Sequence, residues 1–194
     1  MKLLLASSSP WRRTLLQRLG LPFECASPEV DESPMPGEAP AKTALRLARC
    51  KAQALAAAHP DTLVIGSDQV CELNGQALGK PGSLQKAREQ LLACSGQTAL
   101  FHTGLCLFNT GDGRMLESLD CYEVGFRQLT ETEIDVYLAR EDVLGCAGSF
   151  RAEGLGIALF ERMAGEDFNS LVGLPLISLC RLLRQAGLNP LRAS

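Results

Sequence analysis

Residues 2–20 read KLLLASSSPWRRTLLQRLG, and the predicted fold depends on the pattern in this stretch. The apolar run KLLLA is followed by three serines and a proline. After them Trp11, Leu15 and Leu19 recur at helical spacing. Pro10 suits the first turn of a helix, and Gly20 provides a signal for its end. The stretch therefore predicts a buried strand, a serine-rich loop and a helix.

The same alternation of strand-like and helix-like segments continues along the chain. We expect helices at about 41–58, 83–94, 130–140 and 171–187, and strands at 62–68, 69–78, 99–126 and 150–162. Asn74-Gly75 predicts a hairpin turn within 69–78, and the spacing of Thr130 and Glu133 is typical of a capping box. Residues 27–40 form a long loop rich in proline and acids. The pattern predicts a mixed α/β fold, with residues 1–194 in a single domain.

Composition limits the classes of function. The chain has 194 residues, of which 46% are hydrophobic and 21% charged, and its formal net charge is −3. A dedicated binder of nucleic-acid polymers usually has a surplus of Lys and Arg, so that class is not expected, whereas a single nucleotide is compatible with this charge. The N-terminal apolar run is too short for a signal peptide, and no segment approaches the ~20 apolar residues of a membrane span. We expect a cytoplasmic protein without membrane partners.

Eight cysteines raise the question of disulfides or zinc. They contain no CxxC pair, and only two histidines, His59 and His102, could complete a zinc site. We therefore expect reduced and mostly buried thiols.

The serine-rich loop has the features of a phosphate site. Backbone N–H groups at a helix N-terminus carry partial positive charge, and the hydroxyls of Ser7, Ser8 and Ser9 add donors, although the pattern does not say which of the three contacts phosphate. Arg12, in the first turn of the helix, supplies a guanidinium that suits phosphate oxygens. Ordinary helix capping with solvent-facing arginines is the alternative that the pattern leaves open.

Two carboxylates form a second candidate group. Asp68 follows an apolar strand, where ligands of open α/β sheets often bind, and Glu32 lies in the long acidic loop. Brought together, they would hold a divalent metal and orient a water. Alternatively, Asp68 caps a turn and Glu32 is solvated. Lys51 and Lys80 are further candidates, although most lysines face solvent.

Seven motifs in order give the chain a specific resemblance. They are LASSSPWRR, VDE, LARCKA, IGSDQV, LGKP, CAGSFRAEG and LVGLPL, between about residues 3 and 187. Their order and spacing resemble the Maf family of nucleoside triphosphate pyrophosphatases. The resemblance implies a fold similar to inosine triphosphate pyrophosphatases, with an elongated mixed sheet, flanking helices and a cleft between two lobes. It also implies cleavage between the α and β phosphates with Mg²⁺, Mn²⁺ or Co²⁺. The family often forms homodimers, so a homodimer is one expectation.

The resemblance also assigns roles to individual residues. Asp68 matches the acid that activates the attacking water and shares in the metal, and Glu32 matches a metal-binding partner. The positions that match triphosphate-binding residues of the family are Ser7, Arg12, Lys51 and Lys80.

Three departures from the common family pattern concern the base. Trp11 stands in for an arginine in SPWRR, Gln69 follows the acid in SDQ where ADT is common, and Glu153 replaces a glutamine in AGSFRAEG. The branch that shares these departures resembles 7-methyl-GTP pyrophosphatases. N7 methylation makes guanine cationic, and an indole face and a carboxylate both attract a cation that carries N–H donors. We expect 7-methyl-GTP as substrate. The alternatives are dTTP or UTP, as in the more common branch, or a regulatory binding role in cell division.

Overall fold

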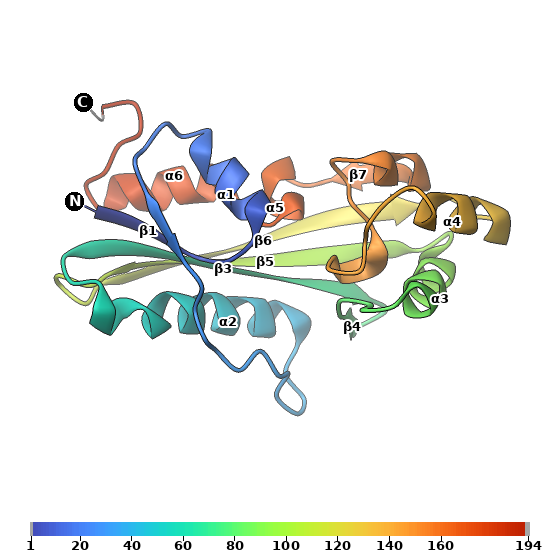
Figure 1. Ribbon diagram of the computed structural model, residues 1–194, viewed down its shortest axis with the longest axis horizontal. Helices are drawn as coiled ribbons and strands as arrows, with labels where there is room; N and C mark the ends of the chain where they lie inside the picture. The colour runs from blue at the N-terminus through green and yellow to red at the C-terminus, as the bar shows by residue number, and fades with distance from the viewer. Residues whose placement is uncertain (1, 193–194) are drawn as a thin grey trace.

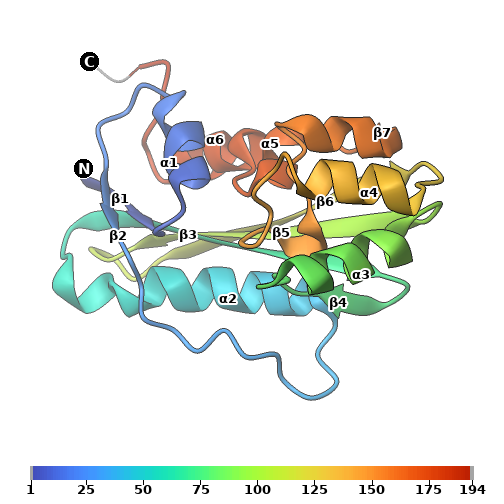
Figure 2. The ribbon, with the colours of Figure 1, turned by 45° about the vertical axis from the view of Figure 1, so that its right-hand side comes forward.

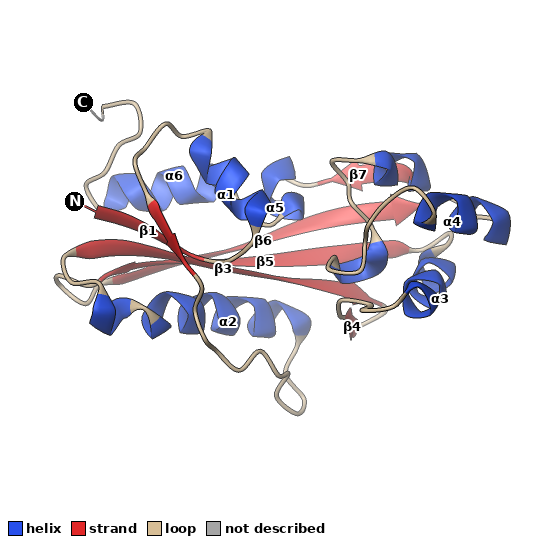
Figure 3. Ribbon diagram, viewed as in Figure 1, coloured by secondary structure: helices blue, strands red, loops and turns tan. Residues whose placement is uncertain are grey.

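The computed structural model describes residues 2–192 and is built around one mixed sheet of seven strands (Figures 1 and 3). The strands are β1 (Lys2–Ala6), β2 (Glu24–Ala26), β3 (Thr62–Leu73), β4 (Gln76–Leu78), β5 (Thr98–Asn109), β6 (Met115–Phe126) and β7 (Phe160–Ala164). Their order is β2-β1-β3-β5-β6-β7, and β4 pairs with β3. Strands β2, β1 and β3 run parallel, and the other pairs are antiparallel. The mixed α/β prediction is confirmed.

Helices cover both faces of the sheet. They are α1 (Pro10–Gln17), α2 (Pro40–Ala54), α3 (Leu84–Cys94), α4 (Glu131–Leu138), α5 (Phe168–Val172) and α6 (Leu176–Gln185). Helix α2 lies on one face, with α1 and α6 on the opposite face, and α3 and α4 lie toward the far end of the long strands (Figures 1 and 2). The predicted cleft between two lobes and the single-domain boundary both stay predictions.

The opening stretch folds as its pattern predicts. Strand β1 is buried from Leu3 onward, and Leu15 and Leu16 bury one side of α1. The Oγ of Ser9 caps the helix by accepting a hydrogen bond from the backbone N–H of Arg12. Strand β1 pairs in parallel with β3, with Leu5 beside Ile65. The serine-rich loop therefore leaves the sheet at the level of Ser67 and Asp68.

Two glycines allow α2 to pack unusually close to the sheet. A Cβ at Gly66 of β3 would overlap the carbonyl oxygen of Ala48, and one at Gly104 of β5 would overlap that of Ala44. With only hydrogen at these positions, the helix backbone approaches β3 and β5 directly. This approach brings Lys51, one turn further along α2, over the middle of β3.

Several local predictions are confirmed. Asn74 and Gly75 both have positive φ, 51° and 81°, as a type I′ hairpin turn requires. Thr130 forms a complete capping box with Glu133 at the start of α4. The helix predicted at 41–58 ends as α2 at Ala54 and continues as a short 3₁₀ turn, Ala56–Ala58.

Two predictions were wrong at the C-terminal end. Most of the strand predicted at 150–162 is irregular or 3₁₀ (Leu155–Leu159), and only Phe160–Ala164 extends as β7. Ser149 has a positive φ of 63°, and the N–H of Gly154 bonds locally to the carbonyl of Arg151, so this backbone curls instead of pairing.

The single helix predicted at 171–187 is two helices, α5 and α6. Gly173 has φ 122° and Pro175 has no N–H, which ends α5 and delays the start of α6. Gly187 follows α6 with a positive φ, as the prediction required.

The thiol prediction is correct about pairing and wrong about burial. All eight cysteines are free, but only Cys71, Cys94 and Cys106 are buried. Burial raises the pKa of the Cys94 thiol to about 12. Within residues 2–192, no helix is long and apolar enough to cross a membrane.

Candidate functional site

Lys51 joins the two predicted carboxylates. Its Nζ lies 2.6 Å from Oδ1 of Asp68 and 2.7 Å from Oε1 of Glu32. Helix α2 supplies the lysine and β3 the aspartate, while Glu32 arrives on the loop that runs alongside α2 (Figure 2). The side chains of Lys51 and Asp68 are only 8% and 11% exposed. The three residues therefore form a compact charged cluster, with the lysine shared between the acids.

Further cations act on this cluster. Partial burial works to raise the pKa of Glu32, but the hydrogen bond and charge of Lys51, together with the charges of Lys80 and Arg12, lower it overall. Burial lowers the pKa of Arg12, and the charges of Asp68 and Glu32 oppose this effect. Arg12 and Lys80 thus both lie close enough to act on the Glu32 carboxylate, as expected for cations that converge on one polyphosphate.

Arg12 is held by the loop between α5 and α6. Its Nε donates to the carbonyl oxygen of Gly173 at 2.8 Å, and Oγ of Ser67 donates to the same oxygen at 3.0 Å. Within residues 2–192, the terminal nitrogens of Arg12 make no hydrogen bond. They can therefore donate to a ligand while Nε fixes the direction of the side chain.

The serines of the opening loop have distinct positions. Ser9 caps α1, which agrees with the capping alternative for that residue. Ser7 is buried, and its Oγ accepts from the N–H of Ser9 at 3.1 Å, which leaves its own hydroxyl hydrogen free to donate to a ligand. Ser8 is exposed.

Gln69 connects β3 to α5. Its Nε2 donates to the carbonyl oxygens of Ser170 and Leu171, at 2.8 and 3.0 Å, and to Oγ1 of Thr103 at 3.1 Å. Because these bonds engage the amide nitrogen, the amide oxygen is the part of Gln69 left for a ligand.

Lys80 lies exposed in the loop between β4 and α3. The loop is fixed beside it, because Nε2 of Gln90 donates to the carbonyl oxygen of Gly79 at 3.0 Å. Lys80 can therefore reach a ligand from an ordered backbone.

Trp11 and Glu153 meet through one arginine. The guanidinium carbon of Arg151 lies 4.3 Å from the centroid of the Trp11 ring, and Nε of Arg151 donates to Oε1 of Glu153 at 3.2 Å. Trp11 remains 40% exposed, and it is Leu15 and Leu16 that form the buried face of α1. The indole of Trp11 therefore lies at the surface near the carboxylate of Glu153, the second residue that the sequence predicts to bind the base.

Arg151 and Glu141 were not singled out by sequence reasoning. Nη1 of Arg151 donates to Oε2 of Glu141 at 3.2 Å, and Oε1 of Glu141 accepts from the N–H of Leu155 at 2.9 Å. Arg151 belongs to the motif CAGSFRAEG, which was a signal that could have identified it. Glu141 lies outside all seven motifs, and no residue spacing indicates a role for it.

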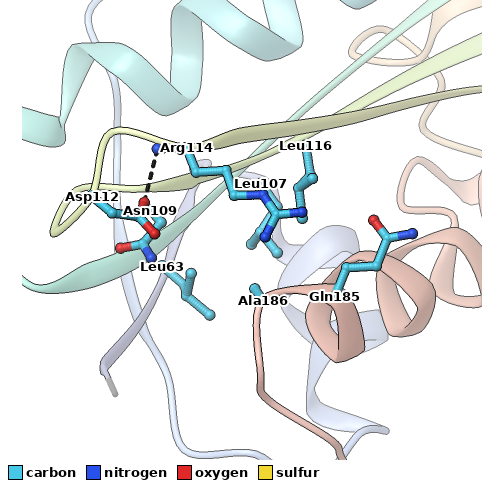
Figure 4. A pocket seen from close by; sticks show the side chains of 8 residues that line it. All are labelled: Leu63, Leu107, Asn109, Asp112, Arg114, Leu116, Gln185 and Ala186. Atoms are coloured by element: carbon cyan, nitrogen blue, oxygen red, sulfur yellow. Dashed lines mark hydrogen bonds between the residues drawn. The ribbon is translucent and has the colours of Figure 1, made fainter.

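A small pocket elsewhere does not involve these residues. It lies between the β5–β6 turn and the end of α6, and Leu63, Leu107, Leu116 and Arg114 are among its lining residues (Figure 4). The carbonyl oxygen of Arg114 accepts from the N–H of Asn109 at 2.9 Å and closes the turn. None of the predicted site residues lines this pocket.

The donor set at the charged cluster fits a hard divalent cation. The carboxylates of Glu32 and Asp68 both contact the Lys51 ammonium, and further cations that could bind phosphate are nearby. Proteins usually hold Mg²⁺ in this way, by one or two carboxylates and by oxygens of the substrate. Within residues 2–192, no group of three or more His, Cys, Asp and Glu side chains could hold a metal. Any further ligands would therefore come from the nucleotide and water.

Comparison with known proteins identifies relatives of this chain. The chain is 56% identical over 185 residues to the 7-methyl-GTP pyrophosphatase of Nitrosococcus oceani. The aligned residues cover 95% of this chain and 93% of that relative. The family model described as Maf-like protein matches residues 2–186. With this match over nearly its whole length, the chain belongs to the Maf family.

Proposed function

We propose that this protein hydrolyses 7-methyl-GTP to 7-methyl-GMP and pyrophosphate. One observation carries the proposal. Trp11 and Glu153 contact the same guanidinium, and Trp11 is next in sequence to Arg12, which feels the charges of Asp68 and Glu32. Two side chains suited to bind a cationic base thus lie next to a charged cluster suited to bind phosphates. The high identity to a 7-methyl-GTP pyrophosphatase supports the same substrate.

The base end suits 7-methylguanine for two reasons. A cation over an indole face gains about 0.5–2 kcal/mol beyond ordinary stacking. The Glu153 carboxylate can accept from both N1–H and the exocyclic amino group of guanine and also attracts the positive ring. A pyrimidine offers neither the positive charge nor this pair of donors.

The triphosphate would lie against the start of α1. The terminal nitrogens of Arg12, the hydroxyl of Ser7 and the ammonium of Lys80 are the donors available to its oxygens. Lys51 would hold the triphosphate from α2 while it keeps its contacts to the acids. Because all nucleoside triphosphates carry the same triphosphate group, these residues bind the substrate without selecting its base.

Asp68 is the residue we assign to take the proton of the attacking water. Its Oδ1 is engaged by Lys51, whereas Oδ2 has no hydrogen-bond partner among the described residues. Because no fully buried side-chain oxygen or nitrogen of the described residues lacks a partner, Oδ2 keeps some exposure to solvent. As the water oxygen bonds to the α-phosphorus, Oδ2 accepts its proton. The bond from the α-phosphorus to the bridging oxygen breaks, and pyrophosphate leaves.

Glu32 and Asp68 are the residues that would hold the divalent cation. When bound, Mg²⁺, Mn²⁺ or Co²⁺ supplies positive charge to the phosphate oxygens. Lys51 keeps the two carboxylates close together, and Arg12 adds a positive charge that interacts with both of them. Removal of a modified nucleotide from the free pool is a cytoplasmic role, and we propose that location. The homodimer stays a prediction.

A substrate panel tests the proposal. Purified protein is incubated with 7-methyl-GTP, GTP, UTP or dTTP and each of Mg²⁺, Mn²⁺ and Co²⁺, and pyrophosphate is detected. We expect the highest kcat/KM for 7-methyl-GTP and loss of turnover with chelator. Faster turnover of UTP or dTTP would contradict the proposed substrate, and release of inorganic phosphate in place of pyrophosphate would contradict the proposed cleavage.

A further inference from the structure

Arg151 occupies both contacts that the base would use. Its guanidinium carbon is 4.3 Å from the centroid of the Trp11 ring, and its Nε donates to Glu153 at 3.2 Å. The side chains of Arg151 and Glu153 are 23% and 27% exposed, so solvent reaches the pair. Trp11 and Glu153 are thus already engaged by a cation of this chain.

The guanidinium resembles the recognition edge of 7-methylguanine. Both are flat, both carry positive charge, and both present N–H groups from a nitrogen–carbon–nitrogen edge to a carboxylate. Arg151 would also repel a second cation held within a few ångströms of it. The guanidinium and the base therefore cannot take the same face of Trp11 and the same carboxylate oxygen together.

Arg151 has a further partner that the base does not need. Nη1 donates to Glu141, whose other oxygen is fixed by the N–H of Leu155 at 2.9 Å. The backbone N–H of Arg151 donates to the hydroxyl of Tyr137 at 3.1 Å, which anchors the main chain. The side chain can thus leave Trp11 and Glu153 while its charge stays paired with Glu141.

We propose that Arg151 is a resident competitor for the 7-methylguanine site and sets the affinity of that site. The inference rests on the proposed function. A base binds by displacing the guanidinium from Trp11 and Glu153 toward Glu141. The contacts that are lost equal one exposed cation–π contact and one exposed ion pair, so the competition weakens base binding by about 3- to 30-fold.

Trp11 allows a direct test because it is the only tryptophan of the chain. The fluorescence of the wild type and of Arg151→Gln, excited near 295 nm, is titrated with 7-methyl-GMP and separately with GMP, with chelator present. Arg151→Lys is a second variant that keeps a charge at this position. Arg162→Gln is the matched control, because Arg162 is an exposed arginine paired with Glu123 at 3.0 Å outside the site.

Under the proposal, Arg151→Gln binds both nucleotides more tightly, by a similar factor of about 3 to 30, and Arg151→Lys lies between it and the wild type. Arg162→Gln leaves both affinities unchanged. Weaker binding by Arg151→Gln would show that Arg151 contacts the ligand and would overturn the proposal. Tighter binding of 7-methyl-GMP alone would show that Arg151 repels the base without leaving, and unchanged affinities would show no competition. Either result would also overturn it.

The test separates this inference from the proposed function. Suppose that the wild type hydrolyses 7-methyl-GTP and binds 7-methyl-GMP but that Arg151→Gln binds no tighter. Then only the competition is wrong. Absence of any fluorescence response in both proteins would remove the base site itself, and with it both proposals.

Discussion

The phosphate end and the base end of the site are built differently. Around Lys51 the ion pairs are short, at 2.6 and 2.7 Å, and the side chains of Lys51 and Asp68 are nearly buried. Around Arg151 both ion pairs measure 3.2 Å, and Trp11 is 40% exposed. Charges shielded from water interact more strongly and reorganise less, whereas exposed contacts exchange easily. The protein thus fixes Lys51 and Asp68 by burial and leaves the groups for base recognition exchangeable, while Glu32, whose side chain is 51% exposed, is held mainly by its contact with Lys51.

The largest expected effect is at the phosphate end. Asp68→Asn keeps the size of the side chain but removes the proton acceptor, so kcat for 7-methyl-GTP should fall by about 10²- to 10⁴-fold. Binding of 7-methyl-GMP, measured by Trp11 fluorescence, should change little, and any partner binding in cell division would persist. A variant that retains more than about a tenth of the wild-type turnover would show that Asp68 is not the acceptor.

The second effect is on stability. Lys51→Met leaves the buried Asp68 carboxylate without its cation, so the free energy of unfolding should fall by about 3–5 kcal/mol. Lys42→Met, at an exposed position of the same helix, should stay within about 0.5 kcal/mol of the wild type. Urea unfolding at neutral pH compares the two variants. Equal losses would mean that the Lys51 cluster is not a buried charge network.

The third effect is on base recognition. Trp11→Ala should lower kcat/KM for 7-methyl-GTP by about 2- to 30-fold, the range of a cation–π contact, and should lower that for UTP much less. Because Trp11 is not a buried residue of α1, the urea midpoint should barely move. Parallel losses on both substrates would place the indole outside the base site.

The smallest effect concerns the loop that carries Glu32. The hydrogen bond from Arg46 lowers the pKa of Glu38, despite some desolvation, from its ordinary 4.5 to about 2. A depressed folded-state pKa means that the contribution of Glu38 to stability is fully present above about pH 4.5 and is lost as the pH falls through about 2.

Urea midpoints of the wild type and Glu38→Gln should therefore differ by a constant amount from pH 5 to 8, and the difference should shrink below pH 4.5. A difference that grows as the pH falls would contradict this sign.

Local signals in the sequence predicted much of the fold. The β1–α1 unit, the turn at Asn74-Gly75 and the capping box at Thr130 depend on neighbouring residues, and each formed as expected. The segment 150–159 did not, because its path depends on positive φ and local bonds instead of strand pairing. The short strand β2 was missed because ECA gives no periodic signal.

The candidate site was predicted in part. The residue pattern singled out Asp68 and Glu32, and the family resemblance added their roles and that of Trp11. The structure places the two acids on one lysine. What the sequence could not provide are contacts made across the fold. Gly66 admits α2 to the sheet, and Glu141 lies ten residues from its partner Arg151. Such contacts depend on how the elements pack, which residue spacing alone does not encode.

The central claim is that the site recognises the positive charge of 7-methylguanine. The most direct test is the ratio of kcat/KM for 7-methyl-GTP to that for GTP, because the two substrates differ only in the N7 methyl group and the charge that it brings. We predict that the wild type prefers 7-methyl-GTP and that Glu153→Gln, which removes the carboxylate and keeps the shape, lowers the ratio by roughly tenfold. A ratio that is the same in the wild type and Glu153→Gln would contradict the account.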